Sequence, residues 1–203
     1  MMRGKKLTRL AAFAVFAATL QTATPQTPAL DLTRDAAPPA PVAAPAAEGE
    51  IPMNVLASAN KAQRGRTLQA AVVMDIPRGL HVNSNRPLSR YTVATVVRVN
   101  APRGAKVSAV RYPRAVVRKF EFSEERLAVY EGRAVLRFTV TFPENFPEGV
   151  ARLRVVVNYQ ACSDTVCYQP DTKDMTLPIG VVGPDDPVQS INRNIFGGGG
   201  RRR

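Results

Sequence analysis

Two cysteines, Cys162 and Cys167, are the residues of this 203-residue chain whose type and spacing point most directly to chemistry. The chain has no others, so each is the only intramolecular disulfide partner of the other. As a structural staple, a disulfide across so short a loop would stabilise the fold by about 2 kcal/mol, near the low end for disulfides. As a reagent, the pair would cycle between dithiol and disulfide, because a short, exposed ring is accessible to an attacking thiolate. The residues themselves leave both possibilities open.

The other reactive groups of the chain give weaker indications of chemistry. His81 is the only histidine and begins a short predicted strand, so we interpret it as a structural residue whose ring is hydrogen-bonded within the fold. Structural zinc needs four ligands, and the chain provides two cysteines and one histidine, so we predict no metal site. No serine or acidic pair stands in a hydrolase pattern, and no glycine-rich phosphate loop precedes a helix. We therefore predict no cofactor.

The start of the chain indicates the compartment. Residues 1–9 carry four Lys or Arg and no acidic residue, and the apolar run Leu10–Leu20 follows. Eleven residues of helix rise only about 16 Å, roughly half the thickness of a hydrocarbon core. Residues 1–23 are therefore predicted to be a secretory signal peptide rather than a membrane span. An exported protein meets oxidising conditions, in which a close cysteine pair can form a disulfide.

Composition divides the rest of the chain into three parts. Residues 24–50 are rich in Pro and Ala and are predicted to be a disordered linker. Residues 51–182 are long enough for one domain with a hydrophobic core, and residues 183–203 are predicted to be a flexible tail ending in Gly4-Arg3. The net charge of +12 favours acidic partners or anionic surfaces. The arginine run has no aromatic residues among it, so we interpret it as solvated rather than as a nucleic-acid site.

Alternation with period two recurs along residues 51–182, and helical periodicity does not. In Arg133–Phe142, for example, apolar side chains alternate with Arg and Thr. The same pattern occupies the ranges Thr67–Ile76, Tyr91–Asn100 and Val150–Tyr159. Turn sequences with Pro and Gly separate these segments. The pattern predicts an all-β fold, namely an immunoglobulin-like antiparallel β-sandwich, with a small barrel as the alternative. The chain has no Trp, so the label describes architecture only. The cysteines follow the last of the four strands and are expected at the tip of a β-hairpin.

The cysteine segment carries a resemblance to a known family. Val157–Lys173 reads Val-Asn-Tyr-Gln-Ala-Cys-Ser-Asp-Thr-Val-Cys-Tyr-Gln-Pro-Asp-Thr-Lys, and it resembles the N-terminal domain of the thiol:disulfide interchange protein DsbD. Leu80–Pro87 (Leu-His-Val-Asn-Ser-Asn-Arg-Pro) and Val129–Gly132 (Val-Tyr-Glu-Gly) are similar to two further segments of that family. One departure is Gln169-Pro170, where the family commonly has Pro-Pro.

The resemblance implies an immunoglobulin-like periplasmic domain that passes reducing equivalents to other proteins. Cys167 would form the mixed disulfide and Cys162 would resolve it, with Tyr159 and Tyr168 flanking the site and no cofactor involved. The family also shields its cysteines with a short loop of aromatic and acidic residues. The candidates for this cap loop are Phe120, Glu121 and Phe122, although both phenylalanines could instead be ordinary core or edge residues.

The implied partners are periplasmic thioredoxin-like proteins or disulfide isomerases. The chain has no membrane electron-transporting domain and no thioredoxin-like Cys-x-x-Cys domain, so we expect its electrons to come from a separate membrane protein. No nucleic-acid partner and no stable membrane insertion are expected. The alternative function is a noncatalytic β-sandwich module for binding or assembly, in which Cys162 and Cys167 form a structural hairpin disulfide. The reduction potential of the pair distinguishes the two hypotheses.

Overall fold

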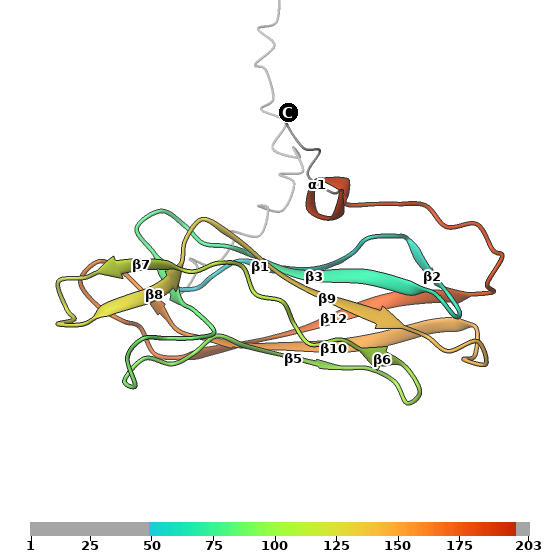
Figure 1. Cartoon of the computed structure of the whole chain (residues 1–203), viewed down its shortest axis with the longest axis horizontal. Coiled ribbons are helices and arrows are strands. Elements are labelled where there is room, and N and C mark those ends of the chain that lie inside the picture. The colour runs from blue at the N-terminus through green and yellow to red at the C-terminus, as the bar shows by residue number, and fades with distance from the viewer. Residues whose placement is uncertain (1–48, 198–203) are drawn as a thin grey trace, which may run out of the picture. The chain divides into compact units, whose positions relative to one another are not determined.

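Twelve β-strands and one short helix make up residues 49–197, the part of the chain that the computed structural model describes (Figure 1). The predicted signal peptide, residues 24–48 of the predicted linker, and residues 198–203 lie outside it. The elements are β1 (Met53–Ala57), β2 (Lys61–Gln63), β3 (Thr67–Asp75), β4 (His81–Asn83), β5 (Val96–Asn100), β6 (Lys106–Val107), β7 (Val116–Lys119), β8 (Arg126–Tyr130), β9 (Arg133–Thr141), β10 (Gly149–Tyr159), β11 (Ala161–Cys162), β12 (Asp171–Val182) and α1 (Arg193–Phe196).

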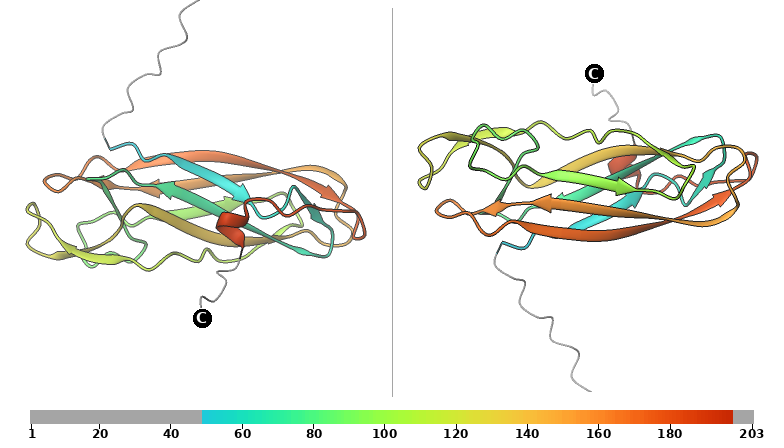
Figure 2. Two further views of the ribbon diagram at one scale, coloured as in Figure 1. Left: turned by 90° about the horizontal axis from the view of Figure 1, so that it is seen from above. Right: turned by 90° about the horizontal axis from the view of Figure 1, so that it is seen from below.

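The strands form three sheets of four. Their orders are β1-β3-β9-β6, β2-β12-β10-β5 and β11-β4-β8-β7, and none of these three sheets closes on itself. In Figure 1, β3 and β9 lie above β12, β10 and β5, and in the views from above and below in Figure 2 the two sets of strands overlap, so the first two sheets are layers that face each other. All pairings are antiparallel except that of β2 with β12. The predicted all-β, immunoglobulin-like fold is confirmed.

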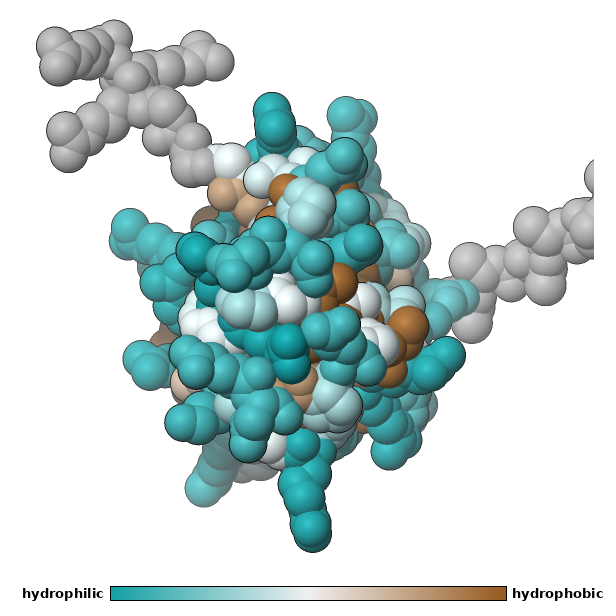
Figure 3. All heavy atoms as spheres, turned by 90° about the vertical axis from the view of Figure 1, so that its right-hand side faces the viewer, coloured by the Kyte–Doolittle hydropathy of each residue, from teal (hydrophilic) through white to brown (hydrophobic). Residues whose placement is uncertain are grey.

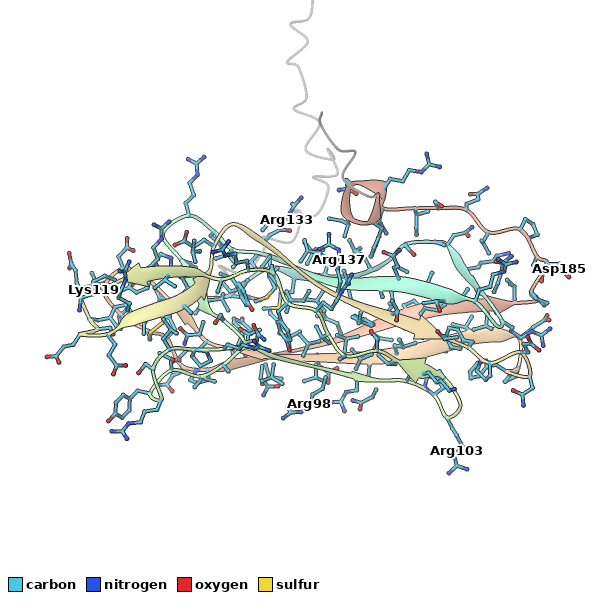
Figure 4. All side chains as sticks on the ribbon, viewed as in Figure 1. Arg98, Arg103, Lys119, Arg133, Arg137 and Asp185 are labelled. Carbon is cyan, nitrogen blue, oxygen red and sulfur yellow. A yellow bond between two sulfur atoms is a disulfide. The ribbon has the colours of Figure 1, made fainter. Side chains whose placement is uncertain are left out.

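The core lies between these layers and follows the predicted alternation. In β9 the side chains of Leu136, Phe138 and Val140 are at most 2% exposed, whereas Arg133 is exposed. Strand β10 repeats the pattern, with every second side chain from Ala151 to Tyr159 buried. Figure 4 shows Arg98 and Arg133 on opposite outer faces of the two layers. One continuous apolar cluster therefore joins the sheets, and the basic residues between its members face solvent.

One strand is shorter than the alternation predicts. The expected strand Tyr91–Asn100 begins only at Val96, and the Tyr91 side chain is 77% exposed rather than buried. Preceding residues form a loop that side chains hold in place: Thr95 Oγ1 donates to the Asn83 carbonyl at 2.5 Å. Because residues 91–95 are held by side-chain hydrogen bonds of this kind and not by pairing with a neighbouring strand, the apolar side chain of Tyr91 is not buried.

The folded unit also extends beyond the predicted boundary at Val182. Residues 183–197 run back along the β1 and β3 side of the sandwich, and Ile191 N donates to the Ser58 carbonyl at 2.9 Å. We call this segment the C-terminal strap. Its Ile195 is 8% exposed and packs on Ala71 and Val73, which face outward from β3. The strap is ordered here because β3 is apolar on both faces and needs a cover on the outer one. Within residues 49–197, no helix has the length and apolar character needed to cross a membrane.

Candidate redox site at one end of the sandwich

The two cysteines lie in the connection between β10 and β12, which pair as the predicted hairpin. Cys162 and Cys167 form a disulfide and are opposite partners in an isolated antiparallel bridge, with their Cα atoms 3.9 Å apart. A tight turn between them is closed by Ser163 N, which donates to the Val166 carbonyl at 2.7 Å. β11, which contains Cys162, also pairs with β4, so the pair is anchored in the sheet β11-β4-β8-β7.

The two sulfur-bearing residues differ in their access to solvent. Cys162 is 1% exposed, whereas Cys167 is partly exposed and lines a cavity of about 360 Å³. The other residues lining this cavity come from the 84–95 loop, the β7–β8 connection, the start of β8 and the position between β10 and β11: Ser89, Tyr91, Thr92, Phe122, Ser123, Glu124, Glu125, Leu127 and Gln160. A partner molecule can therefore approach the disulfide from the side of Cys167.

The side chain of Gln160 forms hydrogen bonds to three segments at this end of the sandwich. Its Oε1 accepts hydrogen bonds from Asn83 Nδ2 at 3.0 Å and from Val93 N at 3.2 Å, and its Nε2 donates to the Tyr168 carbonyl at 3.0 Å. One side chain thus joins β4, the 84–95 loop and the segment after the disulfide. Sequence reasoning gave Gln160 no role. A signal was available, because it is a polar residue between the buried Tyr159 and Ala161.

His81 lies directly beside the disulfide. In the register of β4 with β11 it is the partner of Cys162. Its Nε2 is 3.0 Å from Asp164 Oδ1 in the disulfide turn, while its Nδ1 is buried and has no hydrogen-bond partner. The nearest carboxylate oxygen to Nδ1 is Glu131 Oε1, at 3.5 Å. The interpretation of His81 as a hydrogen-bonded structural residue therefore holds for one ring nitrogen and not for the other.

The candidate cap loop joins β7 to β8, and two of its three candidate residues reach the site. The Phe120 ring lies 4.5 Å from the His81 ring, centroid to centroid, and stacks on Phe122 at 5.4 Å. Phe122 lines the cavity beside Cys167, whereas Glu121 is exposed and does not. Phe120 also packs with Leu127, so this ring belongs to a small core as well as to the site.

The two flanking tyrosines brace the segment rather than line the cavity. Tyr159 is 1% exposed; its hydroxyl donates to Asp171 Oδ2 at 2.8 Å and accepts from Ile51 N at 3.4 Å. Burial, and next this hydrogen bond with Asp171, raises the pKa of Tyr159 to about 12. Tyr168 is partly buried and its N donates to the Ala161 carbonyl at 2.9 Å.

A charged pair stands behind His81. Arg118 donates from Nε and Nη2 to the two carboxylate oxygens of Glu131, at 2.8 and 2.9 Å. These hydrogen bonds, with smaller contributions from the charges of Arg118 and His81, hold the pKa of Glu131 below its usual range despite partial burial. Among residues 49–197, no cluster of three or more His, Cys, Asp and Glu side chains is arranged to hold a metal ion.

The fold and the site together define a class of protein: an all-β immunoglobulin-like domain with a cysteine pair in the connection between two long strands. Residues 53–179 match the family described as thiol:disulfide interchange protein DsbD, N-terminal, and the chain belongs to that family. This confirms the resemblance of the cysteine segment.

Two solved structures are similar over most of their length. The reduced DsbD N-terminal domain of Neisseria meningitidis shares 19% identity, with a TM-score of 0.43, and the match covers 68% of this chain and 91% of that one. The GAE domain of GGA2p from Saccharomyces cerevisiae shares 13% identity, with a TM-score of 0.32 and coverages of 62% and 89%. No curated protein matches the chain.

Proposed function

We propose that this protein is an exported thiol–disulfide exchange domain, an electron relay that passes reducing equivalents through Cys162 and Cys167 to protein disulfides in the periplasm. The observation that carries the proposal is the unequal exposure of the pair. Cys162 is 1% exposed, whereas Cys167 borders an open cavity of about 360 Å³. Membership of the DsbD N-terminal family supports the same chemistry.

The exchange has two steps. In the reduced protein, the Cys167 thiolate attacks one sulfur of a client disulfide, which forms a Cys167–client disulfide and releases the other client thiolate. Cys162 then loses its proton, attacks Cys167 Sγ and expels the second client thiolate. Two electrons and two protons pass to the client, and the Cys162–Cys167 disulfide is restored. Because the two Cα atoms lie 3.9 Å apart, the second step needs no large backbone movement.

The surroundings of Cys167 suit a protein client. Phe122 and Tyr91 line the cavity, and three large side chains near it are strongly exposed: Leu88 at 61%, Tyr91 at 77% and Val166 at 50%. In this proposal these side chains form the apolar surface that a client contacts. The opposite end of the folded unit, which carries Asp185, is mostly hydrophilic (Figures 3 and 4). In this proposal Phe120, Glu121 and Phe122 form a cap that moves aside when the client docks.

The clients would be periplasmic thioredoxin-like proteins or disulfide isomerases, and a separate membrane electron transporter would reduce the domain. A second candidate is a noncatalytic β-sandwich module for binding or assembly. Burial of Cys162 in the β11–β4 pairing favours it, since a structural disulfide is protected in the same way.

Trapping in cells separates these functions. A Cys162→Ala variant keeps the attacking Cys167 but cannot resolve the mixed disulfide, so it should accumulate covalent complexes in the periplasm that reducing agent dissolves. The matched Cys167→Ala variant should accumulate far fewer. Absence of complexes from both variants, together with a Cys162–Cys167 reduction potential well below about −300 mV, would identify a structural disulfide and overturn the relay.

A further inference from the structure

His81, Cys162 and Cys167 form a row across neighbouring backbone segments. His81 is the register partner of Cys162 on one side, and Cys167 is its bridge partner on the other. Directly opposite residues in antiparallel pairs project their side chains on the same face, with Cβ atoms about 5 Å apart. His81 is thus the titratable residue that the strand register places opposite the buried Cys162.

One ring nitrogen of His81 is held and the other is free to accept a proton. With its hydrogen on Nε2, the ring donates to Asp164 Oδ1 at 3.0 Å, which leaves the lone pair on Nδ1. Nδ1 is buried without a hydrogen-bond partner, and the whole residue is 8% exposed. A base whose second nitrogen is oriented by a carboxylate is the arrangement that enzymes use to activate nucleophiles.

Cys162 needs such a base. Its 1% exposure limits access of water to its thiol, and burial disfavours the thiolate relative to the thiol. Only the thiolate can attack the mixed disulfide. On these grounds, and resting on the exchange function proposed above, we propose that His81 accepts the proton of Cys162 and thereby sets the rate of resolution. The proton moves from Cys162 Sγ to His81, and the new S–S bond forms as the Cys167–client bond breaks. His81 then releases its proton as the expelled client thiolate takes one up, so the number of protons is unchanged.

Two carboxylates lie beside the ring, one near each nitrogen. Asp164 faces Nε2 from the disulfide turn, and Glu131 Oε1 lies 3.5 Å from Nδ1 at the end of β8. The cation of Arg118, on β7, is bound by Glu131. The fourth neighbour, Phe120, is uncharged and covers the ring from the cap loop. An imidazolium formed here stands between two carboxylates.

The two sulfur steps can be timed separately with an aromatic disulfide, 5,5′-dithiobis(2-nitrobenzoate), on the reduced full-length protein. Attack by Cys167 releases one thionitrobenzoate at a rate proportional to reagent concentration. Resolution by Cys162 releases the second at a rate independent of it. In His81→Gln, the first rate should change little, and the second should fall by about tenfold or more at neutral pH. This deficit should shrink as the pH rises, because hydroxide then takes the thiol proton.

Asp164→Asn is the companion variant, since the Asp164 side chain is 73% exposed and its replacement should leave the fold undisturbed. It should slow the second release less than His81→Gln does, with the same pH trend. Equal rates of the second release in both variants and the wild type overturn the inference. A reduction of this rate that is the same at every pH also overturns it, because such a reduction would reflect structural disturbance. If the wild type releases no second thionitrobenzoate at all, the exchange function itself fails.

Discussion

Gln160 is the residue whose hydrogen bonds hold the disulfide segment to the rest of the cysteine end. It makes three side-chain bonds, to Asn83, Val93 and Tyr168. At roughly 1 kcal/mol each, their loss in Gln160→Ala should lower the free energy of unfolding by about 2–3 kcal/mol. Urea unfolding of the oxidised protein measures this.

The matched control for that substitution is Gln169→Ala, nine residues further along the same segment. Gln169 is exposed, and its side chain makes no hydrogen bond among the residues that the structure describes. Its replacement should change the unfolding free energy by less than about 0.5 kcal/mol. Equal effects of the two substitutions would mean that the bonds of Gln160 do not stabilise the native state.

At the scale of elements, the C-terminal strap is a cover for the outer face of β3. Ile195 is 8% exposed on Ala71 and Val73, whereas Ile191 in the same strap is 39% exposed. Ile195→Ala should therefore cost about 1–2 kcal/mol of unfolding free energy, less than a central core truncation because the contact has one side only. Ile191→Ala should cost under about 0.5 kcal/mol. Neither should alter the rates of thionitrobenzoate release, since the strap covers β3 and not the cysteine sheet. A change in those rates would contradict this separation.

The long strands could be predicted because they bury one face over many residues. Alternation of period two located β9 and β10 to within a residue or two, and the motif around Cys162 indicated the site at the end of β10. The two-residue strand β11 and the four-residue helix α1 could not be found this way, because elements so short show no periodicity. That His81 lies opposite Cys162 could not be predicted from the sequence, because their proximity results from the pairing of β11 with β4.

At the scale of the whole molecule, an electron relay has to stay folded in both redox states. Most of the core cluster comes from β3, β9, β10 and β12, and neither cysteine is a member of it. Opening a ring this small should destabilise the domain by only about 2 kcal/mol, so the reduced protein should unfold cooperatively at a somewhat lower urea concentration. A Cys162→Ser/Cys167→Ser variant, which has no sulfur to oxidise, should match the reduced protein in stability.

The contribution of the disulfide to stability can also be measured from reduction potentials, because folding and reduction form a thermodynamic cycle. If the disulfide adds about 2 kcal/mol to folding, then folding lowers the potential of the pair by about 40 mV relative to the unfolded chain. Potentials measured against glutathione, with and without denaturing urea, should differ by this amount. A shift several times larger would mean that the fold locks the disulfide, as a staple requires. A shift near 40 mV leaves Cys162 and Cys167 exchangeable, because the folded domain then loses little stability when the Cys162–Cys167 bond is exchanged for a bond between Cys167 and a client.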